Sequence, residues 1–516
     1  MPGTYTYPGV YIEELPSGVR TITGVSTSDT AFIDFFARGK VNDPVRITGF
    51  GDFEREFGGL DSRSEASYAI RQFFANGGAI AWVVRVAHFN ASTARGALAA
   101  EYTDLPTLQV SAANPGDWGN RIEVAVERPT GSVFNLLVRE VDQQGQVTQS
   151  ETHLNLNLTV GSARFAVAAV NNASRLVQLQ SVGFGDLPAV RSFTRLNSLN
   201  SGGLARDGSD GDAPDATELT GSESPPKTGL YALDKIAPSV FNILCIPATA
   251  NLQDAPMGTL VAAAEAYCEA KRAFFILDIP PGVAEQDQMK SWLDTRARFR
   301  HKNAAVYFPR LEIPDPLNEF RPRNVGPSGT LAGIYARIDA ARGIWKAPAG
   351  TDAVIRGNAS LTRKLTDKEN GALNPLGINV LRTFPVFGPL AWGARTLDGA
   401  DQQASEWKYI PVRRTALFIE EALYQGLQWV VFEPNDEPLW AEIRLNVGAF
   451  MNSLFRQGAF QGKAPADAYF VKCDKETTTQ NDIDRGIVNI LVGFAPLKPA
   501  EFVVIKIQQK AGQIQT

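Results

Sequence analysis

A regular alternation of strand-like and helix-like segments in the middle of the chain restricts its fold most. Between residues 230 and 348, apolar runs typical of buried strands alternate with longer segments of helical character. The strand-like runs are 241–246, 273–279 and 304–308, and the helix-like segments are 260–272 and 284–300. Strands that alternate with helices pair as a parallel sheet, because each helix carries the chain back across the sheet. We therefore predict an α/β domain here.

The residues on either side of this region have different patterns. From 107 to 190, short strand-like runs are separated by turn signals, which favours a small β-sandwich or barrel. Residues 197–227 are rich in Ser, Gly, Asp and Pro, so we expect a loop there. From 380 onward the pattern is mixed α+β, with helices expected over 413–425 and 439–456.

An earlier segment, residues 22–87, has the pattern of a βαβ-like unit. Residues 31–36 and 79–86 are largely apolar and typical of buried strands. Between them, residues 65–76 carry apolar side chains at helical spacing, and two glycines follow, as they do after many helices.

Length, composition and charge exclude several classes of protein. A chain of 516 residues is long enough for three or four domains. With 44% hydrophobic and 20% charged residues, it is neither disordered nor a coiled-coil rod. The net charge of −5 and the absence of any long Lys/Arg run argue against direct nucleic-acid binding. Cys245, Cys268 and Cys473 are too scattered for a disulfide framework or a zinc site.

The beginning of the chain indicates where it is made. Residues 1–9 have neither the basic nor the apolar region of a signal peptide. No apolar run approaches the 18 residues of a membrane span. We therefore expect synthesis and assembly in the cytoplasm, without membrane insertion by this chain.

Histidine is scarce, which limits the possible nucleophile–base pairs. The histidines are His88, His153 and His301. Asp278, His301 and Ser328 occur in Asp–His–Ser order inside the α/β region, but no G-x-S-x-G motif surrounds Ser328. Order alone is weak evidence, so we predict no catalytic residues and no enzymatic activity.

Two short motifs resemble ligand-binding loops, and each lacks a required residue. Residues 207–212 resemble a calcium loop, with Glu218 as a possible last ligand, but Asp212 stands where glycine is required. Residues 49–52 begin like a dinucleotide-binding fingerprint without its third glycine. We therefore predict a mobile acidic loop at 207–212, no metal site and no cofactor.

The stretch 432–440 carries three carboxylates close together. Acid/base chemistry is one interpretation, and a strand end followed by a helix start is the simpler one. In the second, Pro434 ends a strand, Asn435 or Asp436 caps the next helix, Glu437 lies in its first turn, and Trp440 packs inward.

Eight motifs, in order along nearly the whole chain, resemble those of the contractile tail sheath proteins of phages and phage-tail-like injection systems. They are residues 7–14 (YPGVYIEE), 114–120 (NPGDWGN), 327–333 (PSGTLAG), 345–349 (WKAPA), 392–396 (WGART), 409–414 (YIPVRR), 432–440 (FEPNDEPLW) and 495–502 (APLKPAEF).

This resemblance implies a structural subunit of a virion tail or phage-tail-like particle. Such subunits form hexameric rings that stack helically around an inner tube, and contraction of the sheath drives the tube through a target cell envelope. The implied partners are further copies of the chain, the inner tube protein, and baseplate and tail-terminator or cap proteins.

The resemblance also implies a multi-domain α+β and α/β fold. A mixed inner domain is built from the N- and C-terminal segments, with an inserted β-sandwich-like domain and a subtilisin-like α/β domain without catalytic residues. The expected boundaries are 1–20 (N-terminal arm), 21–90 (inner domain, first part), 91–228 (outer β-rich domain), 229–379 (α/β domain), 380–499 (inner domain, second part) and 500–516 (C-terminal arm).

The two ends of the chain read as short strands that can complete a neighbour's sheet. Apolar residues at each end are bounded by turn signals or by a polar tail. The residues expected to exchange between subunits are Val10, Tyr11, Ile12, Phe502, Val503, Val504, Ile505 and Ile507.

Two other functions remain as alternatives. A static scaffold or tube-like assembly protein could share such arms, although tube subunits are usually small single β-domains. A subtilisin-like hydrolase would need a convergent triad, which the sequence does not indicate.

Overall fold

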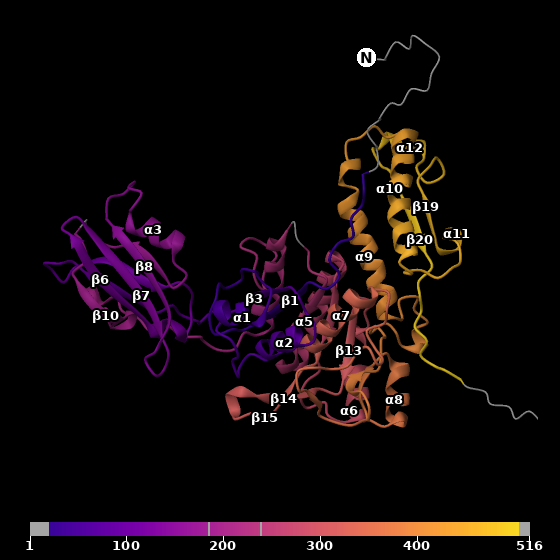
Figure 1. Ribbon diagram of the computed structural model, residues 1–516, viewed down its shortest axis with the longest axis horizontal. Helices are drawn as coiled ribbons and strands as arrows, with labels where there is room; N and C mark the ends of the chain where they lie inside the picture. The colour runs from indigo at the N-terminus through magenta and orange to yellow at the C-terminus, as the bar shows by residue number, and fades with distance from the viewer. Residues whose placement is uncertain (1–19, 184–185, 238–239, 505–516) are drawn as a thin grey trace, which may run out of the picture. The chain divides into compact units, whose positions relative to one another are not determined.

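The computed structural model describes residues 20–183, 186–237 and 240–504, and Figure 1 shows the course of the chain. The chain divides into two compact units. The larger runs from Ser26 to Arg414, and the smaller combines residues 20–25 with residues 415–504. Within the described ranges, no helix has the length and hydropathy that a membrane span requires.

Within the described residues, the larger unit is organised around an eight-stranded mixed sheet. Its central strands are parallel, and each edge strand pairs antiparallel with its neighbour. In spatial order the strands are β18 (Gly388–Ala391), β17 (Asn379–Phe384), β13 (Ala304–Phe308), β12 (Phe274–Leu277), β11 (Ile243–Cys245), β1 (Thr30–Asp34), β3 (Ala81–Arg85) and β2 (Val45–Ile47). The parallel α/β arrangement predicted for residues 230–348 is confirmed.

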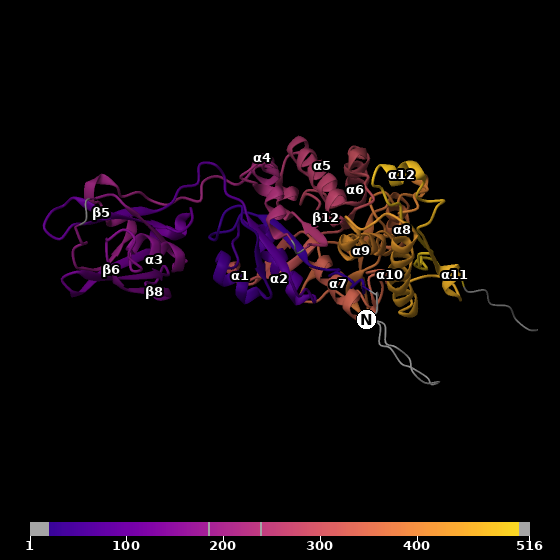
Figure 2. The same cartoon turned by 90° about the horizontal axis from the view of Figure 1, so that it is seen from above.

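Helices cover both faces of this sheet, as Figure 2 shows. α5 (Asp254–Lys271) and α6 (Gln286–Asp294) lie on one face, and α2 (Glu65–Ala75) and α7 (Ser328–Arg342) lie on the other. The helix expected over 284–300 ends early, at Asp294.

Side chains of β12 pack against helices on both faces of the sheet. Phe275 and Leu277 of β12 share a core with α5, whereas the ring of Phe274 lies 6.4 Å from that of Tyr335 in α7. A strand that is buried on both faces needs apolar side chains at every position. This is why β12 is a continuous apolar run in the sequence.

The sheet contains residues that we expected in another domain. β1 lies between β11 and β3, with Thr30 opposite Ile243 on one side and Ala81 on the other. We expected residues 21–90 to fold with residues 380–499, but the compact units divide at 26 and 415. The physical reason is that β1 is buried on both faces, which places it inside a parallel sheet.

Residues 95–195 contain two antiparallel sheets, β10-β6-β7-β8 and β4-β5-β9. Leu108 of β5 and Val124 of β6 belong to one core between the sheets, which is the sandwich, one of the two arrangements (sandwich or barrel) that the turn spacing favours. The strands are β4 (Arg95–Ala99), β5 (Pro106–Ala112), β6 (Ile122–Thr130), β7 (Val133–Val141), β8 (Val147–Leu156), β9 (Val177–Ser181) and β10 (Arg191–Arg195).

Shorter elements complete the larger unit. A small antiparallel sheet pairs β14 with β15 and β16. The remaining elements are α1 (Phe50–Phe57), α3 (Ala166–Ala173), α4 (Ala216–Thr220), β14 (Leu311–Asp315), β15 (Arg321–Val325), β16 (Ser360–Leu361) and α8 (Asp367–Leu373).

The smaller unit is built from two long helices and a two-stranded sheet. The predicted helices are confirmed as α9 (Ile410–Gly426) and α10 (Glu437–Arg456). Residues 20–25 pack against both helices, and a side chain at Gly426 would collide with Ile22. The other elements are α11 (Pro465–Ala468), β19 (Tyr469–Lys472), α12 (Gln480–Asp484) and β20 (Leu491–Phe494).

Two glycines allow α7 to approach α2 closely. A Cβ atom at Gly329 would lie 2.2 Å from the Ala69 carbonyl oxygen, and one at Gly333 would lie 2.4 Å from that of Phe73. Both distances are far inside van der Waals contact, so only glycine is compatible with this helix spacing.

We expect Gly329→Ala to lower the free energy of unfolding by roughly 1–3 kcal/mol, because the two helices must move apart. Gly371→Ala is the matched control. Gly371 is in α8 with open space around its α-carbon, so alanine there should stabilise the protein by roughly 0.5–1 kcal/mol. Urea denaturation measures both changes, and equal effects would contradict the close packing.

Candidate functional site

A buried carboxyl, one of the three residues in the Asp–His–Ser order noted in the sequence, lies at the carboxyl end of β12. Asp278 follows the strand and is 1% exposed. It accepts hydrogen bonds from the backbone amide of Ser328 at 2.9 Å and from its hydroxyl at 2.5 Å. Ser328 is the first residue of α7, so its amide is one of those that a helix start leaves unpaired. The structure thus brings two of the three triad candidates together.

The third candidate, His301, makes different contacts. Its Nε2 lies 3.3 Å from a carboxylate oxygen of Glu269, and its Nδ1 accepts a hydrogen bond from the Asn303 amide at 3.1 Å. In a Ser–His–Asp triad a histidine removes the proton of the serine, and here the Ser328 hydroxyl donates directly to the Asp278 carboxyl instead. Asp278 and Ser328 therefore have the geometry of a structural clamp.

The other histidines are also separate from Ser328. His88 lies 2.6 Å from the side-chain oxygen of Asn90, and His153 lies 3.4 Å from Glu151. Within the described part of the chain, no group of three His, Cys, Asp or Glu side chains is placed to hold a metal ion.

A second carboxylate extends the clamp. Glu65 accepts hydrogen bonds from the Gly326 amide and from the guanidinium of Arg310. Arg310, which is 2% exposed, also donates to the carbonyl of Ile279 at 2.6 Å. The network therefore fixes the chain after β12, the start of α7 and the start of α2 against one another.

Burial controls the protonation of this cluster. It raises the pKa of Asp278 to about 7, and the neighbouring charge of Glu65 acts in the same direction. Burial also raises the pKa of Asp34, at the end of β1, to about 7. A carboxyl whose pKa is higher in the folded state stabilises the fold fully below its unfolded pKa, and this contribution is lost as the pH rises through 7.

We therefore expect Asp278→Asn to remove part of the pH dependence of stability. The unfolding free energy of the wild type, relative to this variant, should fall by roughly 1–4 kcal/mol between pH 4 and pH 8. Asp287→Asn in α6 is the control, because that side chain is 92% exposed. Parallel curves for the wild type and Asp278→Asn, measured by denaturation at each pH, would contradict the assignment.

The acidic segment 207–212 is not the mobile loop that we expected. Asp210 is buried, and one of its carboxylate oxygens accepts a hydrogen bond from the Asp117 amide at 3.0 Å. Its other oxygen forms an ion pair with Arg63 at 2.8 Å. The expectation of mobility was wrong here because Arg63 and Asp117 are distant in sequence, and a single-sequence pattern does not indicate their contact.

The stretch 432–440 is a helix start, as predicted, but no strand precedes it. Asp436 caps α10, and Trp440 is buried with its indole nitrogen donating to the Asn435 side chain at 2.9 Å. A short 3-10 helix (Gln428–Val430) and a turn occupy the place of the expected strand. In this turn, the side chain of Phe432 is fully exposed. Its backbone φ of 72° is uncommon for a residue with so large a side chain.

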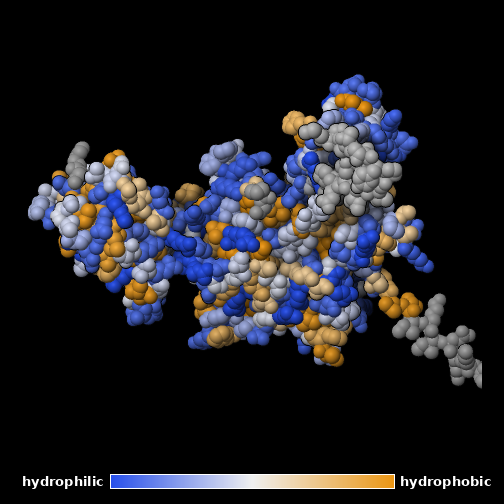
Figure 3. All heavy atoms as spheres, turned by 45° about the horizontal axis from the view of Figure 1, so that its top comes forward, coloured by the Kyte–Doolittle hydropathy of each residue, from blue (hydrophilic) through white to orange (hydrophobic). Residues whose placement is uncertain are grey.

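The predicted strand-exchange residues lie at the limits of the described chain. Phe502, Val503 and Val504 are 77–81% exposed and belong to no strand in the single chain. Figure 3 shows hydrophobic side chains exposed at the C-terminal end of the described chain. The other predicted exchange residues, Val10, Tyr11, Ile12, Ile505 and Ile507, lie outside the described residues.

The smaller unit contains an isolated two-stranded sheet. β19 and β20 pair antiparallel from Tyr469–Phe494 to Lys472–Leu491. Phe470 and Leu491 are about half exposed, each 53%. Among the described residues, β19 and β20 pair only with each other, so each has an outer edge that can accept a further strand.

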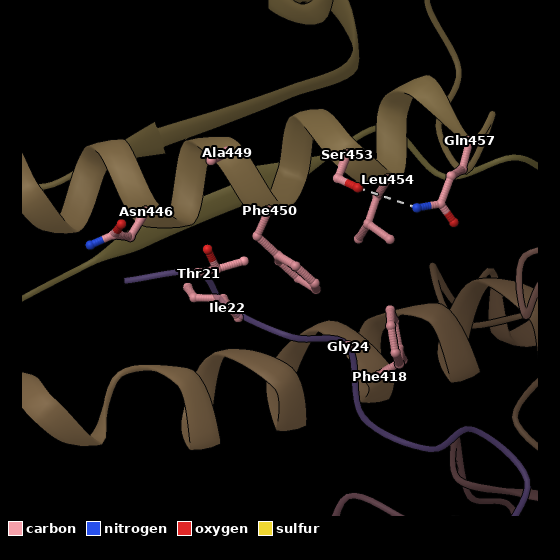
Figure 4. A pocket seen from close by; sticks show the side chains of 10 residues that line it. All are labelled: Thr21, Ile22, Gly24, Phe418, Asn446, Ala449, Phe450, Ser453, Leu454 and Gln457. Atoms are coloured by element: carbon pink, nitrogen blue, oxygen red, sulfur yellow. Dashed lines mark hydrogen bonds between the residues drawn. The ribbon is translucent and has the colours of Figure 1, made fainter. Parts of the chain in front are cut away.

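A pocket of about 270 Å³ also lies in the smaller unit, between α10, α9 and residues 21–24 (Figure 4). The rings of Phe418 and Phe450, with centroids 6.2 Å apart, line it together with Ile22 and Leu454. Asn446 also lines it, and both polar atoms of its buried amide lack a hydrogen-bond partner. Sequence reasoning missed this pocket, because its walls come from both ends of the chain.

Known proteins share this fold and parts of this sequence. The family model of the phage tail sheath protein central domain matches residues 212–397, and that of the phage tail sheath C-terminal domain matches residues 402–510. Together they cover more than half of the chain.

The tail sheath protein of Vibrio phage KVP40 is 28% identical over 192 residues, which are 37% of this chain and 27% of the phage protein. The alignment thus spans less than a third of that relative.

Solved structures match over almost the whole chain. The PVC sheath complex of an extracellular contractile injection system, in its contracted state, is 20% identical with a TM-score of 0.56, covering 98% of this chain and 99% of that one. The sheath tail protein Lin1278 from Listeria innocua is 14% identical with a TM-score of 0.60, covering 92% and 96%. These likenesses show a shared multi-domain fold, and with the two domain matches they support one conclusion. The chain belongs to the phage tail sheath protein family.

Proposed function

We propose that this chain is the structural subunit of a contractile tail sheath. Hexameric rings of it stack helically around an inner tube, and contraction drives the tube through a target cell envelope. The observation that carries this proposal is the pair of sheath domain matches, over residues 212–397 and 402–510. The candidate nucleophile Ser328 contacts the Asp278 carboxyl, whereas His301 pairs with Glu269. Its partners are the inner tube protein, the baseplate and a tail-terminator or cap protein, and it needs no cofactor.

Each part of the chain has a separate task in this proposal. The smaller unit, with contributions from both ends of the chain, faces the tube. The β-sandwich region, within residues 91–228, faces outward. The domain over 229–379 is a subtilisin-like α/β domain without catalytic function, and the Asp278–Ser328 clamp without a histidine supports this reading.

The terminal arms connect the subunits by strand exchange. Exposed apolar residues at 502–504 and the isolated β19–β20 sheet supply the two halves of such a contact, a free strand and a free edge. The residues concerned are Val10, Tyr11, Ile12, Phe502, Val503, Val504, Ile505 and Ile507. Extended arms of this kind let rigid bodies swing without separating.

Removing residues 1–15 or 501–516 should leave a folded protein that builds no long cylinders with its tube partner. Val504→Pro should act likewise, because proline removes a backbone donor from the exchanged strand. Val504→Thr is the matched control, since threonine keeps that donor and the branched shape. Electron microscopy of the assemblies measures the outcome, and normal contractile cylinders from either truncation would contradict strand exchange.

An insertion experiment tests the outward position of the β-rich region. A short tag after Gly145, in the exposed turn between β7 and β8, should leave folding and cylinder formation intact, because the space around its α-carbon is open. The same tag at Asp210 should reduce the yield of folded protein, because it displaces a buried carboxylate from the Asp117 amide and from half-exposed Arg63. Loss of cylinders from the Gly145 insertion alone would place this region at a subunit interface.

The alternatives predict different particles. A sheath gives hollow cylinders of two lengths, extended and contracted, whereas a static scaffold or tube-like assembly gives one length. A hydrolase would show turnover that disappears in Ser328→Ala. Negative-stain imaging of the protein with its tube partner, before and after treatment with denaturant, separates sheath from scaffold.

A further inference from the structure

We propose that Phe432 of one copy inserts into the pocket beside α10 of a second copy, so that the smaller units contact one another head to tail. This inference rests on the proposed sheath function and adds a specific contact to it. Its partner is another copy of this chain, and its two halves, an exposed ring and an apolar pocket, are both present in the single subunit.

Phe432 is held in solvent by a well-anchored loop. Its side chain is 101% exposed, and its φ of 72° is a strained conformation for a non-glycine residue. The loop is fixed nearby, because the Asn435 amide donates to the Ile487 carbonyl at 3.0 Å and the Trp440 indole donates to Asn435. A rigid loop that keeps an aromatic ring away from its own core is typical of an interaction site.

The pocket has a size and a lining that suit one aromatic side chain. Its volume of about 270 Å³ is below the range of most small-molecule sites, which begins at roughly 300 Å³. An apolar cavity of about 150 Å³ is large enough to bind benzene, so a phenylalanine ring can enter this one. Phe418, Phe450 and Leu454 provide the apolar contacts that an inserted ring needs.

The same subunit does not fill its own pocket. Phe432 precedes the start of α10 at Glu437, whereas Leu454 lies near the end of that helix. At 1.5 Å per residue, these two ends are about 25 Å apart along the helix. Because the ring of Phe432 is fully exposed in the single chain, it does not occupy its own pocket, and the occupant that we propose is the ring of another copy.

Charges near the two ends are complementary. Exposed Glu433 and Asp436 lie beside the ring of Phe432 and are acidic. Exposed Arg456 lies in the last turn of α10, next to the pocket residue Gln457, and exposed Lys463 follows it in sequence. When one copy inserts its ring into the next, these opposite charges approach one another, which favours this orientation over the reverse.

A contact of this type repeats from subunit to subunit. Because the two surfaces that meet are different, the contact is heterologous, and heterologous contacts generate rings or helical assemblies rather than closed dimers. This is the symmetry that a stacked sheath needs. The smaller units alone can therefore carry a continuous series of contacts along the assembly.

Two substitutions test the ring and the pocket separately. Phe432→Ala removes the ring, and Ala449→Phe fills the pocket from an exposed position on α10. Each should raise the protein concentration needed to form cylinders about tenfold or more, while Phe432→Leu should retain most of the wild-type behaviour. Phe89→Ala is the control, because Phe89 is also highly exposed, at 84%, and lies in the other unit. Circular dichroism confirms that each variant is folded.

A mixed crosslinking experiment identifies the contact directly. Chains carrying Phe432→Cys and chains carrying Ser453→Cys, with different tags, are assembled together and oxidised. A disulfide between the two tags is expected, and the pair Phe89→Cys with Ser453→Cys should give none. The native cysteines Cys245, Cys268 and Cys473 are buried, so background crosslinking is low.

The outcomes separate this inference from the proposed function. Wild-type cylinders, together with unchanged assembly of Phe432→Ala and Ala449→Phe and no mixed disulfide, would overturn the contact and leave the sheath function standing. A wild-type chain that forms no cylinders with its tube partner would overturn the proposed function and this inference with it. Reduced assembly of both variants plus the mixed disulfide supports the contact.

Discussion

The parallel pairing of β1 with β11 is the contact on which the rest of the larger unit depends. These neighbouring strands begin at Thr30 and Ile243, so the pairing closes a loop of about two hundred residues. This segment contains β2 and β3, which lie in the same sheet, as well as the β-sandwich, and the entropy of closing a loop grows only slowly with its length. In sequence, the β-sandwich lies between two strands of the sheet, β3 and β11. Its hydrophobic core is separate from the core of the sheet.

Buried polar groups fix the places where this insertion and the helices leave the sheet. Arg85, at the end of β3, is completely buried and donates to the carbonyls of Phe36, Gly39 and Pro115 at 2.7–2.9 Å. Such a charge has no water to solvate it, so the carbonyl oxygens that surround it must stay in position. At the end of β12, the Asp278 clamp holds the start of α7 in the same manner. Arg85 and Asp278 thus both hold nearby backbone groups in fixed positions by hydrogen bonds.

Local patterns in the sequence were enough to predict some elements and not others. α10 and the strands β11–β13 were predictable because helix periodicity and buried apolar runs are properties of a few neighbouring residues. The place of β1 in the sheet and the burial of Asp210 were not, because each depends on partners far away in sequence. Similarly, the spacing of residues 432–440 indicated a helix cap, but it gave no sign that Phe432 would be left fully exposed.

The smaller unit joins residues 20–25 to α10, and this has a consequence for the order of synthesis. During translation at about 5–20 residues per second, roughly 20–90 s separate the appearance of Val25 from that of Arg456. Ser26–Arg414, which contains the complete eight-stranded sheet, is synthesised in full about 2–8 s before Arg456 appears, so its strands can begin to pair first. The surfaces of the smaller unit therefore form only after α10 has been synthesised, later than most of the larger unit.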